Sequence, residues 1–258
     1  MKDEKFNNRR QAMGRIGAFG MTGLFGFGSP SAASGASSAV GKAENTATPA
    51  APMPASAAGS CILIPSETAG PYPLLALLGN SAMVRKDIRE GKAGIPLTLV
   101  LKVQDVNRAC RPITNAAVYI WHCDKDGGYS GYSNPDNGSH AGETYLRGIQ
   151  LSDANGEVSF TTIFPGWYQG RITHIHFQIY LNDNLDARAT ATSQLAFPQK
   201  ITRAVYDTPL YRNRGQNTTV ADFSEDGIFS DGAAYQIAAV SGDPAQSLRA
   251  TLTVGISG

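Results

Sequence analysis

Two histidines, His174 and His176, are separated by one residue in a stretch that alternates polar and apolar side chains. On a β-strand, residues i and i+2 point to the same face, so the two imidazoles would stand side by side. Imidazole nitrogens are common transition-metal ligands, and two of them on a rigid strand form half of a metal site. The spacing favours a metal centre, while a pair of merely exposed strand residues has the same spacing.

Two tyrosines lie in glycine-rich loops that belong with this histidine pair. Tyr168 lies in 165–171 (PGWYQGR), which leads into the histidine strand, and Tyr129 lies in 126–132 (DGGYSGY). A phenol has an ordinary pKa of about 10 and ionises at neutral pH only beside a strong Lewis acid. Ferric iron is such an ion, and two tyrosines with two histidines would give it a shell of oxygen and nitrogen ligands.

Four segments of the chain resemble the intradiol ring-cleavage dioxygenases, non-haem ferric enzymes that open catechols between their two hydroxyls. The resemblance runs from about residue 61 to residue 229. The residues at 121–124 (WHCD) are most similar to those of the exported branch of that family. The matching segments are 68–72 (TAGPY), 118–132 (VYIWHCDKDGGYSGY), 164–177 (FPGWYQGRITHIHF) and 193–198 (SQLAFP).

The resemblance implies one Fe(III) per chain. Two of its ligands would be equatorial and two axial, with hydroxide or water in a fifth position. It also implies that the axial tyrosinate leaves when catechol binds iron through both oxygens. The implied equatorial ligands are Tyr129 and His176, and the implied axial ligands are Tyr168 and His174.

The resemblance further implies roles for residues that do not bind metal. Tyr168 and the hydroxide would take the protons of the substrate. Arg171 would stabilise negative charge that develops beside the ring. Gln194 would support the site by a hydrogen bond, although Ala196 replaces the usual aromatic residue of that segment. The residues expected to wall the substrate pocket are Thr68, Gly70, Pro71 and Tyr72.

Several neighbouring residues have plainer interpretations. Tyr132 could be confused with Tyr129, which is preferred because it directly follows two glycines. We expect His122 to be structural or to support the site without binding metal, His140 to be solvated in its loop, and Trp121 to lie in the core. Further candidates for the pocket wall are Leu75, Leu78, Ile113 and Trp167.

The folded part of the chain has the pattern of a β-protein. Period-2 alternation bounded by Gly, Asn, Asp and Pro predicts a single all-β sandwich, and the resemblance implies a transthyretin-like core of this kind. Short helical turns are expected at 82–88 and 202–212. The predicted strands are 96–105, 116–124, 157–164, 172–181 and 248–256.

The first 60 residues differ from the rest in composition. Residues 1–58 carry a net charge of +3, and five of their six basic residues precede thirteen uncharged residues at 16–28. A basic stretch before a short apolar one predicts an export signal at 1–28, and Arg9-Arg10 indicates the twin-arginine type. The alternative is an unstructured tail of a cytoplasmic protein.

A linker and one catalytic domain are expected to follow that signal. Ala, Ser, Gly and Pro make up 25 of the 32 residues at 29–60, which predicts a disordered linker. The catalytic domain would then span 61–258. Of three cysteines, Cys110 could pair with Cys123, or Cys61 could pair with either of them, while Cys61 faintly resembles a lipidation site.

Composition excludes several classes of function. The chain has 258 residues and a formal net charge of +1, which argues against a nucleic-acid binder. It contains no run of 18 apolar residues, so stable membrane insertion is not expected. The expected partners are a small aromatic diol and O2, and the oligomeric state stays open, a homo-oligomer included. The competing functions are a metal-free binding module for a small aromatic, carbohydrate or peptide, and a cell-surface domain on a stalk.

Overall fold

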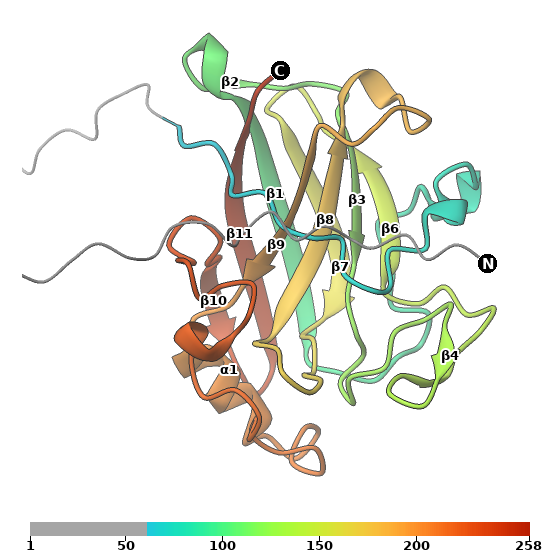
Figure 1. Ribbon diagram of the computed structural model, residues 1–258, viewed down its shortest axis with the longest axis vertical. Coiled ribbons are helices and arrows are strands. Elements are labelled where there is room, and N and C mark those ends of the chain that lie inside the picture. Colours follow the sequence, from blue (N-terminus) through green and yellow to red (C-terminus); the bar gives the residue numbers. More distant parts are fainter. Residues whose placement is uncertain (1–60) are drawn as a thin grey trace, which may run out of the picture. The chain divides into compact units, whose positions relative to one another are not determined.

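The structure is a computed structural model that describes residues 61–258, so the segments predicted for 1–28 and 29–60 lie outside it. Most of its regular structure is β, and short 3-10 turns (η) and α1 occupy the connections (Figure 1). The elements in chain order are η1 Leu75–Leu77, η2 Ser81–Met83, β1 Pro96–Asp105, η3 Val106–Arg108, β2 Arg111–Pro112, β3 Ala117–Trp121, β4 Ser133–Asn134, β5 Gly138–Ser139, β6 Arg147–Leu151, β7 Glu157–Ile163, β8 His174–Tyr180, η4 Leu181–Asp183, β9 Ala191–Ala196, α1 Gln199–Tyr206, η5 Phe223–Glu225, β10 Ala239–Asp243 and β11 Ser247–Ile256.

Two sheets form the sandwich. The first has the order β10-β11-β1-β2, with β7 also paired to β1, and the second has the order β6-β3-β8-β9. β1 runs parallel to β11 and antiparallel to β7. Apolar residues of both sheets meet between them in one core, among them Leu99 and Phe160 of the first sheet and Ile120 and Phe177 of the second. The predicted single all-β sandwich is confirmed.

The second sheet is also covered on its outer face. The segment that follows Cys61 runs along β9, where Glu67 N–H donates to Thr192 O (2.9 Å) and Ser193 Oγ donates to Pro65 O (2.6 Å). A second apolar cluster forms beneath this covering, and it includes Tyr119 and Trp121 of β3. Strand β8 is therefore buried on both faces along its whole length.

Alternation along β8 separates its two faces as expected. Ile175, Phe177 and Ile179 enter the core between the sheets, while His174 and His176 face the covered outer side. β3 alternates in the same way, with Val118 in the core and Trp121 outside it. The two histidine side chains of β8 therefore lie on the outer face of the second sheet, away from the core between the sheets.

The predicted strands match β1, β3, β7, β8 and β11, and β1 matches at both ends. The helical turns differ in extent: η2 ends at Met83, and α1 begins at Gln199 and ends at Tyr206. The sequence prediction missed β6, β9 and β10 and the two-residue strands. β9 was missed because its polar residues Ser193 and Gln194 are buried through contacts with distant parts of the chain.

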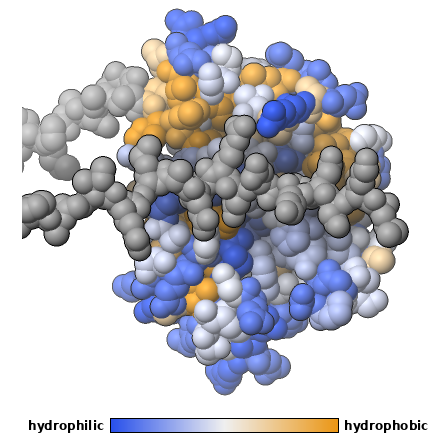
Figure 2. All heavy atoms as spheres, viewed as in Figure 1, coloured by the Kyte–Doolittle hydropathy of each residue, from blue (hydrophilic) through white to orange (hydrophobic). Residues whose placement is uncertain are grey.

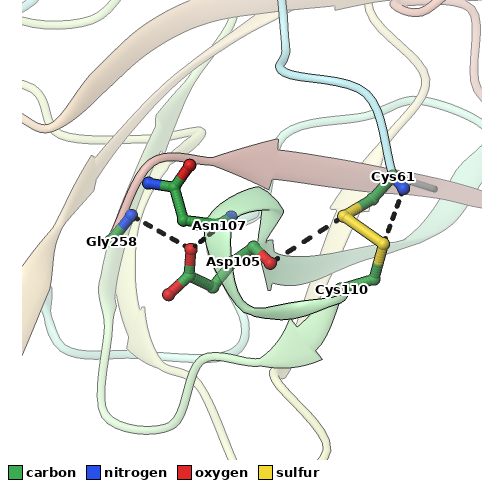
Figure 3. Close-up of a disulfide and its surroundings, with 5 residues drawn as sticks. All are labelled: Cys61, Asp105, Asn107, Cys110 and Gly258. Carbon is green, nitrogen blue, oxygen red and sulfur yellow. Dashed lines mark hydrogen bonds between the residues drawn. A yellow bond between two sulfur atoms is a disulfide. The ribbon is translucent and has the colours of Figure 1, made fainter. Parts of the chain in front are cut away.

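The cysteines pair in one of the ways that the sequence leaves open. Cys61 and Cys110 form a disulfide with their Cα atoms 5.5 Å apart, and Cys123 is free and buried (Figure 3). A Cys110–Cys123 pair is therefore wrong, and the sulfur of Cys61 is engaged in the protein. Nearby, the buried Asp105 carboxylate accepts the backbone N–H of Asn107 (2.9 Å), which fixes the turn after β1.

The surface is mixed in character. In Figure 2, apolar side chains gather in the upper half of the face shown, and hydrophilic ones predominate in the lower half. No helix within residues 61–258 has the length and apolar character needed to cross a bilayer.

We expect the disulfide to contribute about 2–4 kcal/mol to the free energy of unfolding, because it closes a long loop in the unfolded chain. Its two cysteines are 49 positions apart. Reduction of the wild-type protein should lower its Tm, measured by calorimetry. The double variant Cys61→Ser/Cys110→Ser should have the low Tm with and without reductant. A Cys123→Ser protein that no longer responds to reductant would contradict this pairing.

Candidate functional site

Polar atoms from β8 and from the loop before it converge on the covered face of the second sheet. Tyr168 Oη lies 3.2 Å from His174 Nε2, and His174 Nε2 lies 3.0 Å from His176 Nε2. Both histidines are buried, and Tyr168 is partly buried. The structure thus brings together three of the four residues that the sequence predicts as metal ligands, with His174 Nε2 within hydrogen-bond range of the other two.

Hydrogen bonding fixes the state of His174. Its Nδ1 lies 2.6 Å from Ile172 O, and because a carbonyl only accepts, Nδ1 carries the proton. The lone pair of His174 Nε2 therefore points into the cluster. His176 Nδ1 is buried without a partner, so either tautomer of His176 leaves one of its nitrogens unsatisfied. Unsatisfied buried polar atoms cost free energy. The nitrogen of His176 that faces the cluster is Nε2, so it is this lone pair, together with that of His174 Nε2, that a bound group would take.

Tyr129 completes the cluster. Its hydroxyl is buried and has no hydrogen-bond partner in the described part of the chain. Its ring lies edge-on to the rings of Tyr168 and His176, with centroids 5.6 Å and 6.2 Å away. Tyr132 lies outside the cluster, because its hydroxyl accepts the backbone N–H of Leu74 (2.9 Å). Of the two neighbouring tyrosines, Tyr129, which the sequence analysis preferred, is therefore the one whose unpartnered hydroxyl lies at the site.

Burial sets the protonation of these four side chains. It raises the pKa of Tyr168 to about 12 and that of Tyr129 well above its ordinary value. It lowers the pKa of His174 to about 3 and that of His176 well below its ordinary value. At neutral pH the protein alone therefore presents neutral imidazoles, the form that binds metal, and phenols that keep their protons until a cation offsets burial.

Arg171 lies beside the cluster and is held on three sides. Its Nε donates to Asp226 Oδ2 (3.0 Å) and its Nη2 donates to Gln194 Oε1 (2.6 Å). Its Nη1 lies 3.4 Å from Tyr168 Oη. Gln194 is itself fixed, since its Nε2 donates to Thr68 O (3.0 Å). The guanidinium group is thereby a fixed positive charge at the edge of the site.

Asp226 is a residue of the site that the sequence did not reveal. Its carboxylate is fully buried and accepts the backbone N–H groups of Ile172 (2.6 Å) and Ile228 (2.8 Å) in addition to Arg171. Burial alone would raise its pKa, but the Arg171 charge and the backbone donors hold the pKa below its ordinary value. The segment 217–229 is part of the family resemblance, yet an Asp before a Gly in a polar loop has the pattern of a turn residue.

His176 is enclosed by two neighbours. The Trp121 ring stacks on the imidazole with centroids 5.0 Å apart and an interplanar angle of 3°. Gly70 covers it from the loop: a Cβ on Gly70 would lie 3.0 Å from His176 Cε1, and Gly70 has a φ of +66°. Only glycine fits this position without strain, since both the close approach and the positive φ exclude a side chain.

A pocket of about 960 Å³ opens beside Tyr168. Of the four residues predicted to wall the substrate pocket, Pro71 and Tyr72 line this cavity, whereas Thr68 and Gly70 contact Gln194 and His176. The four apolar candidates for the pocket wall do not line this cavity; they are Leu75, Leu78, Ile113 and Trp167. Most of the wall comes from the polar loops 124–128 and 136–140.

The remaining histidines lie apart from the cluster. His122 is structural, with Nδ1 donating to Cys123 O (2.8 Å) and Nε2 accepting from Thr162 Oγ1 (2.7 Å). His140 is half-buried at the pocket wall and pairs with Glu143 (2.6 Å), so it is not simply solvated. Within residues 61–258 no three His, Cys, Asp or Glu side chains meet as a metal site, because two of the four polar groups in this cluster are phenols.

Comparisons with known proteins agree with this geometry. Residues 73–237 match the family model described as Dioxygenase. A solved intradiol ring-cleavage dioxygenase from Tetranychus urticae is 30% identical with a TM-score of 0.66, over 76% of this chain and 95% of that one. The chain belongs to the intradiol ring-cleavage dioxygenase family. No curated protein matched the chain.

A second solved structure supports the fold of this family member. It is the dioxygenase domain of a carbohydrate-binding fusion from the cellulolytic bacterium Streptomyces sp. SirexAA-E, 24% identical with a TM-score of 0.50, over 75% of this chain and 97% of that domain. The family model spans the four clustered side chains and Arg171, whereas the loop 68–72 precedes the matched range.

The contact between Gly70 and His176 can be tested by Gly70→Ala. We expect this variant to lose about 1–2 kcal/mol of stability from the positive φ alone, and more from the collision with the imidazole. Urea unfolding monitored by Trp fluorescence measures the loss. Gly79→Ala is the matched control in the same segment, because Gly79 has open space and no positive φ. Equal stability of the two variants would show that Gly70 does not enclose His176.

Proposed function

We propose that this protein is a non-haem ferric intradiol dioxygenase that inserts both atoms of O2 into a catechol-type diol and yields a muconate-type diacid. The observation that carries the proposal is the convergence of two phenols and two imidazoles on one buried point. Tyr129, Tyr168, His174 and His176 would hold one Fe(III) per chain. Family membership supports the reaction class.

The residues fit a hard trivalent cation. The Tyr129 hydroxyl is buried without a partner, and the Nε2 atoms of His174 and His176 face each other at 3.0 Å. A cation at this point would bind the Tyr129 oxygen and the lone pairs of both Nε2 atoms at once. Phenolate oxygen is a hard ligand and neutral imidazole is a good nitrogen ligand, so the donor set suits ferric iron better than a soft or weakly charged metal.

Bound iron would hold both oxygens of the diol and make its ring reactive toward O2. The protein supplies the proton chemistry at Tyr168. Its Oη lies at the boundary between the cluster and the pocket, and in its ionised form it can accept a proton from a substrate hydroxyl. General base catalysis requires this contact between base and substrate, and the position of Tyr168 between the cluster and the pocket allows it.

Arg171 supplies a positive charge that needs no rearrangement. Its guanidinium is fixed by Asp226 and Gln194 before substrate enters, and its Nη1 points at Tyr168 Oη. Negative charge on the ring or its products would develop beside this group. A preorganised charge in a buried site is worth more than one in water, because neither the protein nor the solvent must reorient.

Iron binding can be tested on the purified protein. We expect about one iron per chain and a visible absorption band from tyrosinate-to-ferric charge transfer, which shifts when catechol is added under nitrogen. His176→Ala should lose the metal and the colour, since it removes one of the three ligands, with Tyr129 and His174, that would hold iron throughout turnover, whereas Tyr168 is the ligand that would leave when catechol binds. Tyr132→Phe is the matched control, because its hydroxyl lies outside the cluster and bonds Leu74 N–H. A colourless protein that stays iron-free after ferric or ferrous reconstitution would favour the binding-module function.

Tyr168→Phe separates proton transfer from metal retention. We expect it to keep the fold and most of the iron, and to lower kcat for catechol by about 100-fold or more, since the ring stays packed while the base is lost. Iron analysis and oxygen uptake measure the two effects. Wild-type turnover in this variant would remove Tyr168 from the mechanism.

We further propose that the protein is exported to the periplasm or the extracellular space through a twin-arginine-type signal. Arg9-Arg10 before the uncharged stretch 16–28 supports this, and so does the Cys61–Cys110 disulfide, because disulfides persist in oxidising compartments. Arg9→Lys/Arg10→Lys should retain the full-length protein in the cytoplasm of a host with this export route. Lys2→Arg/Lys5→Arg is the control. Unchanged export of the Arg9/Arg10 variant in cell fractions would contradict the proposal.

A further inference from the structure

The pocket beside Tyr168 carries more charge than a bare catechol needs. Its volume of about 960 Å³ is at the upper end of what holds a drug-sized ligand, and a catechol has eight heavy atoms. Most of the charged groups on its wall neutralise one another. Lys92 pairs with Asp124 (3.1 Å), and Asp126 pairs with Lys125 (2.7 Å), which itself does not line the pocket. Arg214 is the lining cation that has no acidic partner within residues 61–258.

Arg214 is held in place although it lies at the surface. Its guanidinium stacks over the Trp167 ring at 4.4 Å from the centroid, and its Nη2 donates to Trp167 O (2.9 Å). The Trp167 indole N–H in turn donates to Gly215 O (2.9 Å). The ring and the arginine therefore fix each other, and the residue that holds the arginine directly precedes Tyr168.

The loop that contains Gly127 packs closely against Trp167 and Arg214. A Cβ on Gly127 would lie 2.4 Å from Trp167 O and 3.1 Å from Arg214 Nη2, so the glycine lets the backbone approach the guanidinium. One of the five N–H donors of Arg214 binds Trp167 O, and the stack fixes the plane of the others. A fixed guanidinium with free N–H donors is the usual receptor for a carboxylate, which it binds through two parallel hydrogen bonds.

We propose that Arg214 is a specificity residue that binds a carboxylate attached to the catechol ring of the substrate. The inference rests on the proposed function, since it places the diol at the cluster and the acid at Arg214. Asp136 also lines the pocket without a basic partner, and it is exposed like Arg214. Its carboxylate has no hydrogen bond within residues 61–258 that fixes it, whereas the Arg214 guanidinium is stacked on Trp167 and bonds the carbonyl of that residue. The fixed cation therefore decides the preferred charge of the substrate.

The test compares acids with their own methyl esters, which have nearly the same shape without the charge. The series is 3,4-dihydroxybenzoate, 3,4-dihydroxyphenylacetate and 3,4-dihydroxycinnamate, which moves the carboxylate away from the ring in steps. For the best acid, we expect Arg214→Gln to lower the acid-to-ester ratio of kcat/KM by about 10- to 100-fold. Arg212→Gln should keep the wild-type ratio, because Arg212 is exposed and does not line the pocket.

A binding titration under nitrogen gives a readout without turnover. The Kd of the best acid for the iron-loaded protein should rise by a similar factor in Arg214→Gln. Arg214→Lys should recover part of the affinity, since it restores the charge without the planar fork. The amine 3,4-dihydroxyphenethylamine probes the opposite charge preference.

The outcomes separate this inference from the proposed function. Cleavage of catechol with an acid-to-ester ratio that Arg214→Gln leaves unchanged would overturn the role of Arg214 and leave the dioxygenase intact. A preference for the amine over every acid would overturn it as well. Absence of turnover with catechol, all acids and all esters in the iron-loaded protein would overturn the proposed function itself.

Discussion

Strand β8 is the constraint on which the rest of the molecule depends. All seven of its residues are buried, and their alternation sends Ile175, Phe177 and Ile179 into the core between the sheets and His174 and His176 to the opposite side. The apolar side chains fix the register of the strand, and a shift by one residue would exchange the two faces. The spacing and direction of the two imidazoles are therefore set by core packing, and the site has a rigid floor.

The other half of the site consists of loops that cover the outer face of the second sheet, and this covering leaves buried polar atoms without hydrogen-bond partners. The loop 65–72 crosses the outer face of the second sheet and encloses His176 through Gly70, while the loop around Tyr129 adds a buried phenol. Covering these groups removes them from water without giving each a partner. A protein that only needed stability would place apolar side chains here, so the arrangement is explained by a ligand that the four side chains share.

The sequence predicted those features that are local. Period-2 alternation located β1 and β8 because each strand packs an apolar face, and the glycine-rich loops located Tyr129 and Tyr168. It failed where burial depends on distant partners. Strand β6 begins at Arg147, which is fully buried because it donates to Tyr72 O (2.8 Å) and Ser130 O (2.7 Å) far away in the chain. No local pattern reveals such a residue as part of a strand interior.

Asp226 shows why the same limit applies to the site. It holds Arg171 from 55 residues away, and it also accepts the N–H of Ile172, the residue next to that arginine. One carboxylate thus fixes both the side chain and the backbone from which the side chain starts. The position of the positive charge at the cluster therefore depends on the loop 217–229 as much as on the strand motif. A sequence motif identifies the side chains that do chemistry, but residues outside the motif set the orientation of those side chains.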